Sequence, residues 1–280
     1  MDGKTVVITG ATSGIGEAAA VALAGMGARI VFLARSAARA QALKDRLVRA
    51  NPDAAHEGVI GELASLAGMR AAAAALGAKA PRIDVLANNA GAIFDHRETT
   101  LDGLEKTFAL NHMAYFVVTE ALRPNLDPAG GRIIATSSVV HTMGHADDPQ
   151  TQGRYSAMRA YGTSKLCNIL WTRALARRLD GSGVTANCFH PGAVGTGFGH
   201  NTAGPIRLMF RLVSPFSLTP EQGADTLVWL ASSPQVEGKS GGYYVRRRLT
   251  QPSAAARDAA AAEALWVESE RIAGSAVAAA

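Results

Sequence analysis

Tyr161 and Lys165 lie four residues apart in the stretch RAYGTSKLCN, a spacing that places a phenol and an ammonium on one face of a helix. A free phenol has a pKa of about 10, too high for a base at neutral pH. A nearby cation favours the phenolate, so we expect Lys165 to lower the pKa of Tyr161. Such a pair can give a proton to a carbonyl oxygen and take it back. The alternative is a surface pair with no chemical role.

A second stretch, VVITGATSGIGEAA, places Gly10, Gly14 and Gly16 between an apolar strand and a helix. Glycines at this position let the backbone approach a pyrophosphate, and the helix that follows offers free N–H groups. The spacing is G-x-x-x-G-x-G, which differs from the common G-x-G-x-x-G fingerprint. A tight turn without a ligand is the alternative, but the strand–loop–helix context favours a dinucleotide site.

The next strand, RIVFLARS, ends at Ala34 and Arg35. Sites that prefer NAD usually carry an acidic residue here, which grips the ribose hydroxyls. Arg35 can instead pair with a 2′-phosphate through its forked guanidinium. We therefore expect NADP(H) to be preferred, with NAD(H) still possible, unless Arg35 is only a solvated surface residue.

Apolar runs rich in Val and Ile alternate with Ala- and Leu-rich helical segments along most of the chain. This alternation predicts an α/β fold: a single doubly wound Rossmann-type parallel sheet with helices on both faces. We expect one domain over residues 1–280. Long helices are predicted at 101–122 and 161–179, and a C-terminal helix at about 254–273, with Leu265, Trp266 and Ile272 packed on the domain.

Composition narrows the function classes. The chain has 280 residues, 48% of them hydrophobic and 18% charged, which suits a large buried core. Its basic residues are scattered and give a net charge of +5, with one basic triplet at Arg246–Arg248 and no interleaved aromatic residues, so we expect no nucleic-acid partner.

The cysteines and the apolar runs bear on the compartment. Cys167 and Cys188 form no C-x-x-C, which fits a reducing cytoplasm. We expect no signal peptide and no integral membrane segment, because glycines and Arg29 interrupt the long apolar run at 18–34.

Four stretches, in order, resemble the short-chain dehydrogenase/reductase family: TGATSGIG at 9–16, NNAG at 88–91, ATSSVV around Ser138 and YGTSK at 161–165. The stretches LNHMAYFVVT, HPGAVGT and GADTLVWLASSPQVEGKSGGYY are similar to the retinol-dehydrogenase-like branch of that family. The resemblance runs from about Lys4 to Ile272.

This resemblance implies interconversion of an alcohol and a ketone or aldehyde on a hydrophobic small molecule. Tyr161 would be the general acid/base, and Ser138 would hold the substrate oxygen; Ser137 is the less favoured of the two serines. Lys165 would also bind the nicotinamide ribose, and Asn111 would hold a water that links Lys165 to solvent.

The resemblance also implies a set of cofactor-binding residues. Glu62 stands where the family usually has an aspartate that holds the adenine. The expected set is Gly10, Thr12, Ser13, Gly14, Ile15, Gly16, Arg35, Glu62, Leu63, Asn89, Ala90, Gly91, Tyr161, Lys165, Pro191, Gly192 and Thr196.

Two segments are expected to form the substrate pocket, at about 139–160 and 193–219. The second is rich in apolar residues between Phe198 and Phe216, which suggests a lid. An interfacial helix, or packing against a neighbouring subunit or the body of the fold, are the alternatives. His141 and His145 are four residues apart but lack an evident third ligand, so we expect no metal.

Several alternatives remain at the level of partners and function. The resemblance implies a homodimer or homotetramer formed through the helices at 101–122 and 161–179. A catalytically silent dinucleotide-binding sensor or scaffold is the main alternative function. A nucleotide-sugar epimerase or dehydratase is disfavoured, because the C-terminal part leaves little room for a sugar-nucleotide domain.

Overall fold

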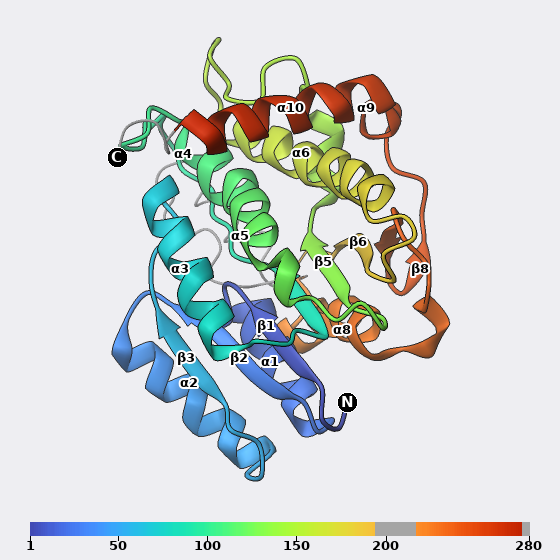
Figure 1. Ribbon diagram of the computed structural model, residues 1–280. Helices are drawn as coiled ribbons and strands as arrows, with labels where there is room; N and C mark the ends of the chain where they lie inside the picture. Colours follow the sequence, from blue (N-terminus) through green and yellow to red (C-terminus); the bar gives the residue numbers. More distant parts are fainter. Residues whose placement is uncertain (194–216, 276–280) are drawn as a thin grey trace.

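The computed structural model describes residues 1–193 and 217–275, and its centre is one eight-stranded sheet in the order β3-β2-β1-β4-β5-β6-β7-β8 (Figure 1). All neighbouring strands pair in parallel except β7 and β8, which are antiparallel. The predicted doubly wound sheet is therefore confirmed, with one antiparallel strand added at its edge. The strands are β1 Thr5–Ile8, β2 Arg29–Ala34, β3 Glu57–Ile60, β4 Val85–Asn88, β5 Arg132–Thr136, β6 Thr185–His190, β7 Tyr243–Val245 and β8 Arg248–Leu249.

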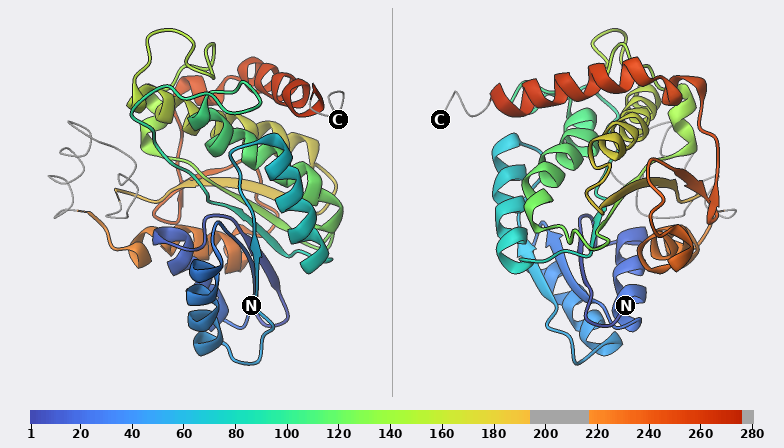
Figure 2. Two further views of the ribbon diagram at one scale, coloured as in Figure 1. Left: turned by 90° about the vertical axis from the view of Figure 1, so that its left-hand side faces the viewer. Right: turned by 45° about the vertical axis from the view of Figure 1, so that its right-hand side comes forward.

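Both faces of the sheet are covered, which explains why its strands are apolar throughout. In β1, Val6 and Ile8 point into one buried cluster and Val7 into the other, as the two-residue repeat of a strand requires. Helices α1 Gly14–Gly25, α2 Ala37–Ala50 and α8 Pro220–Ser232 contribute to the first cluster. Helices α3 Leu66–Lys79, α5 Ala114–Leu122, α6 Ala157–Arg178 and α10 Ala259–Ser275 contribute to the second (Figure 2).

The helix predicted at 101–122 begins later than expected and contains a π-helical turn. A short α4 at Lys106–Phe108 leads into a π-helical turn, η1 Ala109–Met113, and then into α5. The Glu105 carboxylate caps this helix by accepting from the N–H groups of Thr107 (2.8 Å) and Phe108 (2.7 Å). Leu101, in contrast, is 99% exposed and has no packing that would hold it in a helix.

Two other predicted boundaries differ from the structure. Helix α6 begins at Ala157, one turn before Tyr161, so the predicted loop at 139–160 is shorter; it opens with a 3-10 helix, η3 Val139–Met143. The C-terminal helix is two helices, α9 Ala254–Arg257 and α10. They separate at Asp258, whose side chain accepts from the N–H groups that follow it and caps α10. Short 3-10 helices also lie at η2 Arg123–Asn125 and η6 Pro234–Val236.

Helix α10 packs along α6 on the outside of the second cluster and contacts α5 at Phe116 (Figures 1 and 2). The Trp266 ring lies edge-on to Phe116 of α5 at 5.1 Å, and the guanidinium of Arg178 of α6 lies 4.1 Å from the Trp266 ring. Leu265 and Ile272 are also buried, so the predicted packing of this helix is confirmed. Of the two helices through which the resemblance implied dimerisation, α6 thus packs along the chain's own C-terminal helix.

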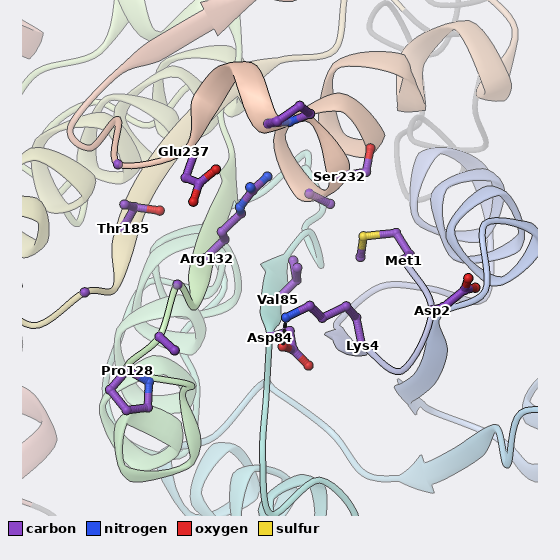
Figure 3. Close-up of a pocket in the computed structure, with 16 residues that line it drawn as sticks. Met1, Asp2, Lys4, Asp84, Val85, Pro128, Arg132, Thr185, Ser232 and Glu237 are labelled. Carbon is purple, nitrogen blue, oxygen red and sulfur yellow. Dashed lines mark hydrogen bonds and ion pairs between the residues drawn. The ribbon is translucent and has the colours of Figure 1, made fainter.

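A cavity of about 680 Å³ opens at the amino ends of the parallel strands, near the N-terminus (Figure 3). We call this side the amino edge of the sheet. Its lining carries both signs of charge, with Lys4 and Arg132 facing Asp84 and Glu237. Arg132 donates to the carbonyl oxygens of Leu230 (3.0 Å) and Ser233 (2.9 Å) and so closes the C-terminal end of α8. The cavity lies away from the carboxyl ends of the parallel strands, where ligands bind in folds of this type.

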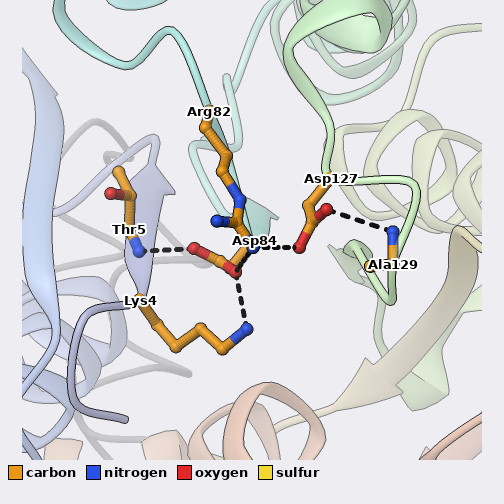
Figure 4. Close-up of polar contacts among 6 residues, drawn as sticks. All are labelled: Lys4, Thr5, Arg82, Asp84, Asp127 and Ala129. Atoms are coloured by element: carbon orange, nitrogen blue, oxygen red, sulfur yellow. Dashed lines mark hydrogen bonds and ion pairs between the residues drawn. The ribbon is translucent and has the colours of Figure 1, made fainter.

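Ion pairs hold the same amino edge together (Figure 4). Lys4 Nζ lies 2.8 Å from Asp84 Oδ1, and Asp84 Oδ2 accepts from the Thr5 N–H at 2.8 Å. Arg82 Nη2 lies 2.7 Å from Asp127 Oδ2, and it lowers the pKa of that carboxyl. These contacts connect β1, the start of β4 and the turn that precedes β5.

None of the helices in the described part of the chain has the length and apolarity needed to cross a membrane.

Candidate active site

The carboxyl ends of β1 and β4, where the strand order reverses, form a cradle in which only glycine fits. Gly10 follows β1 with φ of 67°, and a Cβ added there would lie 2.7 Å from the Ala90 Cα. A Cβ on Gly16 would overlap the Gly10 carbonyl oxygen. Gly14 also has a positive φ, of 55°. The cradle is therefore lined by main-chain atoms, as close approach to a phosphate requires.

Asn89 and Thr9 fix the ends of three strands beside this cradle. The Thr9 hydroxyl accepts from the N–H groups of Asn89 (3.1 Å) and Ala90 (3.2 Å). Asn89 Nδ2 donates to the Gly10 carbonyl oxygen at 3.2 Å, and Asn89 Oδ1 accepts from the Thr136 hydroxyl at 3.2 Å. The loops after β1, β4 and β5 are thus held in one arrangement.

The first turn of α1 differs from those of α2 and α3. Ser36 and Ser65 cap α2 and α3 by accepting from main-chain N–H groups, whereas the Ser13 side chain makes no such bond. The leading amide groups of α1 are therefore left for another acceptor, at the positive end of the helix dipole. Together with the glycine cradle, this arrangement fits a dinucleotide pyrophosphate. Thr12 and Ile15 are partly buried in this turn, and Ser13 is exposed.

The residues expected around the adenosine end lie at the carboxyl ends of β2 and β3. Arg35 is exposed directly after β2, and no salt bridge joins it to another described residue. Glu62 is exposed, but its carboxylate accepts from the Ala64 N–H and from the Ser65 hydroxyl at the start of α3. The Leu63 side chain packs in the core. Glu62 would have to leave these local bonds in order to contact an adenine.

Ser137 and Ser138 follow β5 and have different surroundings. The Ser137 hydroxyl donates to the Lys165 carbonyl oxygen at 2.8 Å and so connects β5 to α6. The Ser138 oxygen accepts from the Val140 N–H at 3.3 Å and caps η3. Because this bond uses an oxygen lone pair, the Ser138 hydroxyl keeps its hydrogen for a further acceptor.

Lys165 lies inside the protein, and its ammonium is surrounded by aromatic rings and main chain. Its Nζ donates to the Thr136 carbonyl oxygen at 3.0 Å and lies 5.5 Å from the Tyr161 ring centre and 5.6 Å from that of Tyr115. No carboxylate of the described residues forms a salt bridge with it. Burial lowers the pKa of Lys165 to about 7.

The pKa of Tyr161 is raised, which is the opposite of the sequence-based expectation. Desolvation raises the pKa of the phenol well above its ordinary value, and a side-chain hydrogen bond with Ser138 only partly offsets this. The reason is that both members of the pair lie in a poorly solvated region, which disfavours the phenolate and the ammonium alike. At neutral pH the phenol is therefore protonated.

Asn111 lies in the π-helical turn and connects the loop after β4 to α6. It accepts from the Ala92 N–H (2.8 Å), and its Nδ2 donates to the Ala92 carbonyl (2.9 Å) and the Ser164 hydroxyl (3.0 Å). A Cβ on Gly91 would lie 3.1 Å from Asn111 Oδ1 and 3.5 Å from Lys165 Nζ. Because Gly91 has no side chain, the side chains of Asn111 and Lys165 can both approach the loop after β4. Such π-turns are frequent at functional sites.

The loop after β6 is described only in part. Pro191 and Gly192 follow the strand, and Gly192 has φ of 90°. The Ala193 carbonyl oxygen accepts from the Leu218 N–H at 2.8 Å. Thr196 and nearly all of the predicted lid lie outside the described residues.

Tyr115 and His141 were not assigned a role in the site from the sequence, and Val139 was included only as the first residue of the pocket segment expected at 139–160. Tyr115 lies beside the Lys165 ammonium, His141 lies under Ser138, and Val139 is 53% exposed next to Ser138. Met143, which was expected near the substrate, is 54% exposed one turn after Val139. The available signal was the four-residue spacing of two apolar side chains directly after Ser138.

Comparison with known proteins places this arrangement in a family. Residues 4–204 match the family described as short chain dehydrogenase. A protein of Streptomyces sp. (strain C5), named "Putative daunorubicin C-13 ketoreductase DnrU", is 43% identical over 98% of this chain and 94% of its own length. Human retinol dehydrogenase 14 is 40% identical over 98% of this chain and 87% of its own.

A solved structure supports the same assignment. It is a short chain dehydrogenase from Burkholderia cenocepacia J2315 in complex with NADP, 28% identical, with a TM-score of 0.70 over 91% of this chain and 98% of its own. The chain therefore belongs to the short-chain dehydrogenase/reductase family, in its retinol-dehydrogenase-like branch.

Proposed function

We propose that this protein is an NADP(H)-dependent oxidoreductase that interconverts an alcohol and a ketone or aldehyde on a hydrophobic small molecule. Family membership makes the chain an oxidoreductase. The observation that carries the finer proposal is the meeting of Ser138, Tyr161 and Lys165 beside a cradle that only glycines can line.

The glycine cradle and the uncapped first turn of α1 would hold the pyrophosphate. Lys165 has three N–H donors and gives one to Thr136, so the others can bind the hydroxyls of the nicotinamide ribose. Residues Asn89 to Gly91, with Pro191 and Gly192, would line the nicotinamide half. The cofactor, when bound, supplies the hydride, and the protein aligns it with the substrate.

The preference for the phosphorylated cofactor rests on the carboxyl end of β2. Arg35 is exposed and unpaired with any described carboxylate, and Arg39 is exposed one turn into α2. The first turn of α2 contains no acidic residue. Two guanidinium groups at this point can pair with a 2′-phosphate. The Burkholderia relative was solved with NADP, which supports this choice.

Tyr161 would donate its phenolic proton to the carbonyl oxygen in reduction and recover it in oxidation. The raised pKa of the phenol keeps the proton available at neutral pH, so the free protein is prepared for reduction. Ser138 would donate its hydrogen to the same oxygen as negative charge develops. The Lys165 ammonium would stabilise the phenolate that remains, and Asn111 would hold the water through which the proton is replaced.

The substrate would be a moderately bulky hydrophobic carbonyl. Val139 and Met143 present exposed apolar side chains directly after Ser138. Tyr155 donates to the Phe94 carbonyl oxygen at 2.9 Å and so holds the loop before α6 against the loop after β4. The names of the relatives, a daunorubicin ketoreductase and a retinol dehydrogenase, point to substrates of this size and polarity.

The first experiment follows oxidation of NADPH, and of NADH in parallel, with daunorubicin and retinaldehyde as carbonyls. We expect the wild type to prefer NADPH, and Tyr161→Phe to lose at least about a hundredfold in kcat. Tyr244→Phe is the matched control, because Tyr244 packs on Trp229 on the α8 side of the sheet. Faster use of NADH would contradict the role of Arg35. Binding of both cofactors without turnover would favour the silent sensor.

A further inference from the structure

The imidazole of His141 joins three segments that are distant in sequence. The residue is 3% exposed in η3. Its Nδ1 lies 2.7 Å from the Ser138 carbonyl oxygen, and its Nε2 accepts from the Ser253 N–H at 3.1 Å, across 112 residues of sequence. Its ring also packs edge-on against Tyr243 of β7 at 5.3 Å. Both polar atoms of the buried ring are therefore satisfied by the main chain.

These two partners fix the tautomer of the ring. A main-chain N–H can only donate, so the Nε2 that faces Ser253 carries no hydrogen. The hydrogen of the neutral ring then lies on Nδ1 and is donated to the Ser138 carbonyl oxygen. Burial lowers the pKa of His141, which agrees with a neutral ring.

Ser138 is held at two points by this arrangement. Its carbonyl oxygen accepts from His141 twice, from the ring and from the main-chain N–H at 3.1 Å. Its side-chain oxygen accepts from the Val140 N–H. These contacts do not fix the direction of the hydroxyl hydrogen. The hydroxyl shares a side-chain hydrogen bond with Tyr161, and there it would have to reach the substrate oxygen.

Helix α6 supports η3 on one side by direct contact between main chains. A Cβ on Gly162, which follows Tyr161, would lie 2.7 Å from the Val140 carbonyl oxygen. A Cβ on Gly144 would lie 2.7 Å from the Gly162 carbonyl oxygen. The other support comes through His141 from Ser253, the residue that caps α9.

We propose that His141 is a positioning residue that orients Ser138, and that the segment before α9 contributes to catalysis through this ring. The inference rests on the proposed function and adds a residue to its machinery. His141 would not exchange protons with the substrate, because both of its nitrogens are engaged inside the protein.

Position 253 allows a matched test. The backbone of Ser253 has φ of −53° and ψ of 161°, which proline can adopt. Ser253→Pro and Ser253→Ala both remove the hydroxyl that accepts from Ala256 at the start of α9, but only Ser253→Pro removes the N–H that His141 accepts. With NADPH and daunorubicin or retinaldehyde, we expect kcat of Ser253→Pro to fall about tenfold below that of Ser253→Ala, the loss of roughly one oriented hydrogen bond. The Kd for NADPH should stay within about twofold, because the cradle is untouched.

Substitutions of His141 supply the second comparison. His141→Asn keeps a donor near the position of Nδ1, whereas His141→Phe keeps the volume and the contact with Tyr243 but removes the donor. The asparagine side chain is too short to accept from the Ser253 N–H as Nε2 does, so we expect this variant to lose about as much kcat as Ser253→Pro. The phenylalanine variant keeps neither polar contact and should lose more.

The outcomes separate two failures. Equal kcat for Ser253→Pro and Ser253→Ala in a working enzyme would overturn the role of His141 alone. So would a loss of kcat in His141→Phe that is matched by an equal weakening of NADPH binding, because the ring would then support the cofactor site as a whole and not Ser138 in particular. A wild type that binds NADPH but reduces neither carbonyl would overturn the proposed function itself.

Discussion

Charged side chains have opposite surroundings at the two ends of the parallel strands, which we call the amino edge and the carboxyl edge of the sheet. At the amino edge, Lys4 is paired with Asp84 and Arg82 with Asp127, and the Lys4 side chain is 47% exposed (Figure 4). At the carboxyl edge, Lys165 is 2% exposed and has no salt bridge with a described carboxylate. Lys4 therefore has a counter-ion and contact with solvent, whereas Lys165 has neither a described counter-ion nor solvent.

This difference separates charges that hold the fold together from charges that are prepared for chemistry. In the ion pairs at the amino edge each charge has a counter-ion, so the pairs stabilise the fold modestly. A buried ammonium without a counter-ion destabilises the fold, so its presence points to a task that needs the charge. Aromatic rings and a carbonyl oxygen around Lys165 stabilise the cation without neutralising it.

The largest expected effect comes from removing each lysine in turn. Lys165→Met should lower kcat for carbonyl reduction by about a hundred- to ten-thousandfold, because it removes the cation beside Tyr161 and a donor to the ribose. Lys4→Met, the matched variant at the amino edge, should leave kcat within about twofold. Steady-state kinetics with NADPH and retinaldehyde measure both. Similar losses in the two variants would remove the distinction between the edges.

The second expected effect is a pH dependence of stability in the cofactor-free protein. Burial lowers the pKa of Lys165 to about 7 in the folded state. At pH values between this pKa and the ordinary one of the unfolded chain, the unfolded chain therefore binds more protons than the folded protein. The free energy of unfolding of the wild type should therefore rise relative to Lys165→Met above pH 7, by at most about 1.4 kcal/mol per pH unit. Below pH 7 the methionine variant should be the more stable one, because it avoids burying a charge.

Urea unfolding of both variants from about pH 6 to pH 9 tests this sign, since all other titrating groups are shared. A constant difference between the two variants would mean that Lys165 keeps its proton throughout. The rings of Tyr115 and Tyr161 would then compensate the ammonium as well as a carboxylate does, and the two edges would differ less than we infer.

The third expected effect concerns the exposed cation at the carboxyl edge. Arg35→Glu should lower the ratio of kcat/KM for NADPH to that for NADH by about ten- to a hundredfold, because it replaces a partner of the 2′-phosphate with a like charge. Arg82→Gln is the control, since Arg82 pairs with Asp127 at the other edge. An unchanged ratio in Arg35→Glu would assign the 2′-phosphate to other residues.

Local sequence patterns predicted the parts of the site that lie on one element. The glycines after β1 and the spacing of Tyr161 and Lys165 depend on a single loop and a single helix, and their positions followed from the sequence. The apolar strands and the covered sheet followed from residue alternation. The pKa direction of Tyr161 did not, because it depends on how deeply the folded chain buries the pair.

Contacts between distant segments could not be read from the sequence. The π-turn at Asn111 and the break at Asp258 depend on which main-chain groups a polar side chain finds after folding. His141 was weighed only as a metal ligand beside His145, because Ser253, its actual partner, lies 112 residues later. The edge strand β8 was also missed; the turn before it places Arg246 and Arg247 at positive φ, which the sequence gives no reason to expect.

The smallest expected effect is on the amino edge itself, where the change should alter stability without altering chemistry. Asp84→Asn keeps one oxygen as an acceptor but faces either the Lys4 ammonium or the Thr5 N–H with an amide NH₂ group. We expect a loss of about 1–3 kcal/mol in the free energy of unfolding at pH 7, with kcat and the Kd for NADPH unchanged.

Asp127→Asn gives a companion measurement with a pH signature. Arg82 lowers the pKa of Asp127 in the folded state, so the carboxylate stabilises the fold above its unfolded pKa, and this stabilisation is lost as the pH falls through the folded value. The wild type and Asp127→Asn should therefore converge in stability in acid and differ at neutral pH. If either variant lost turnover in proportion to Lys165→Met, the amino edge would have to be coupled to the catalytic edge through β1 and β4, and charge pairing would no longer distinguish the two.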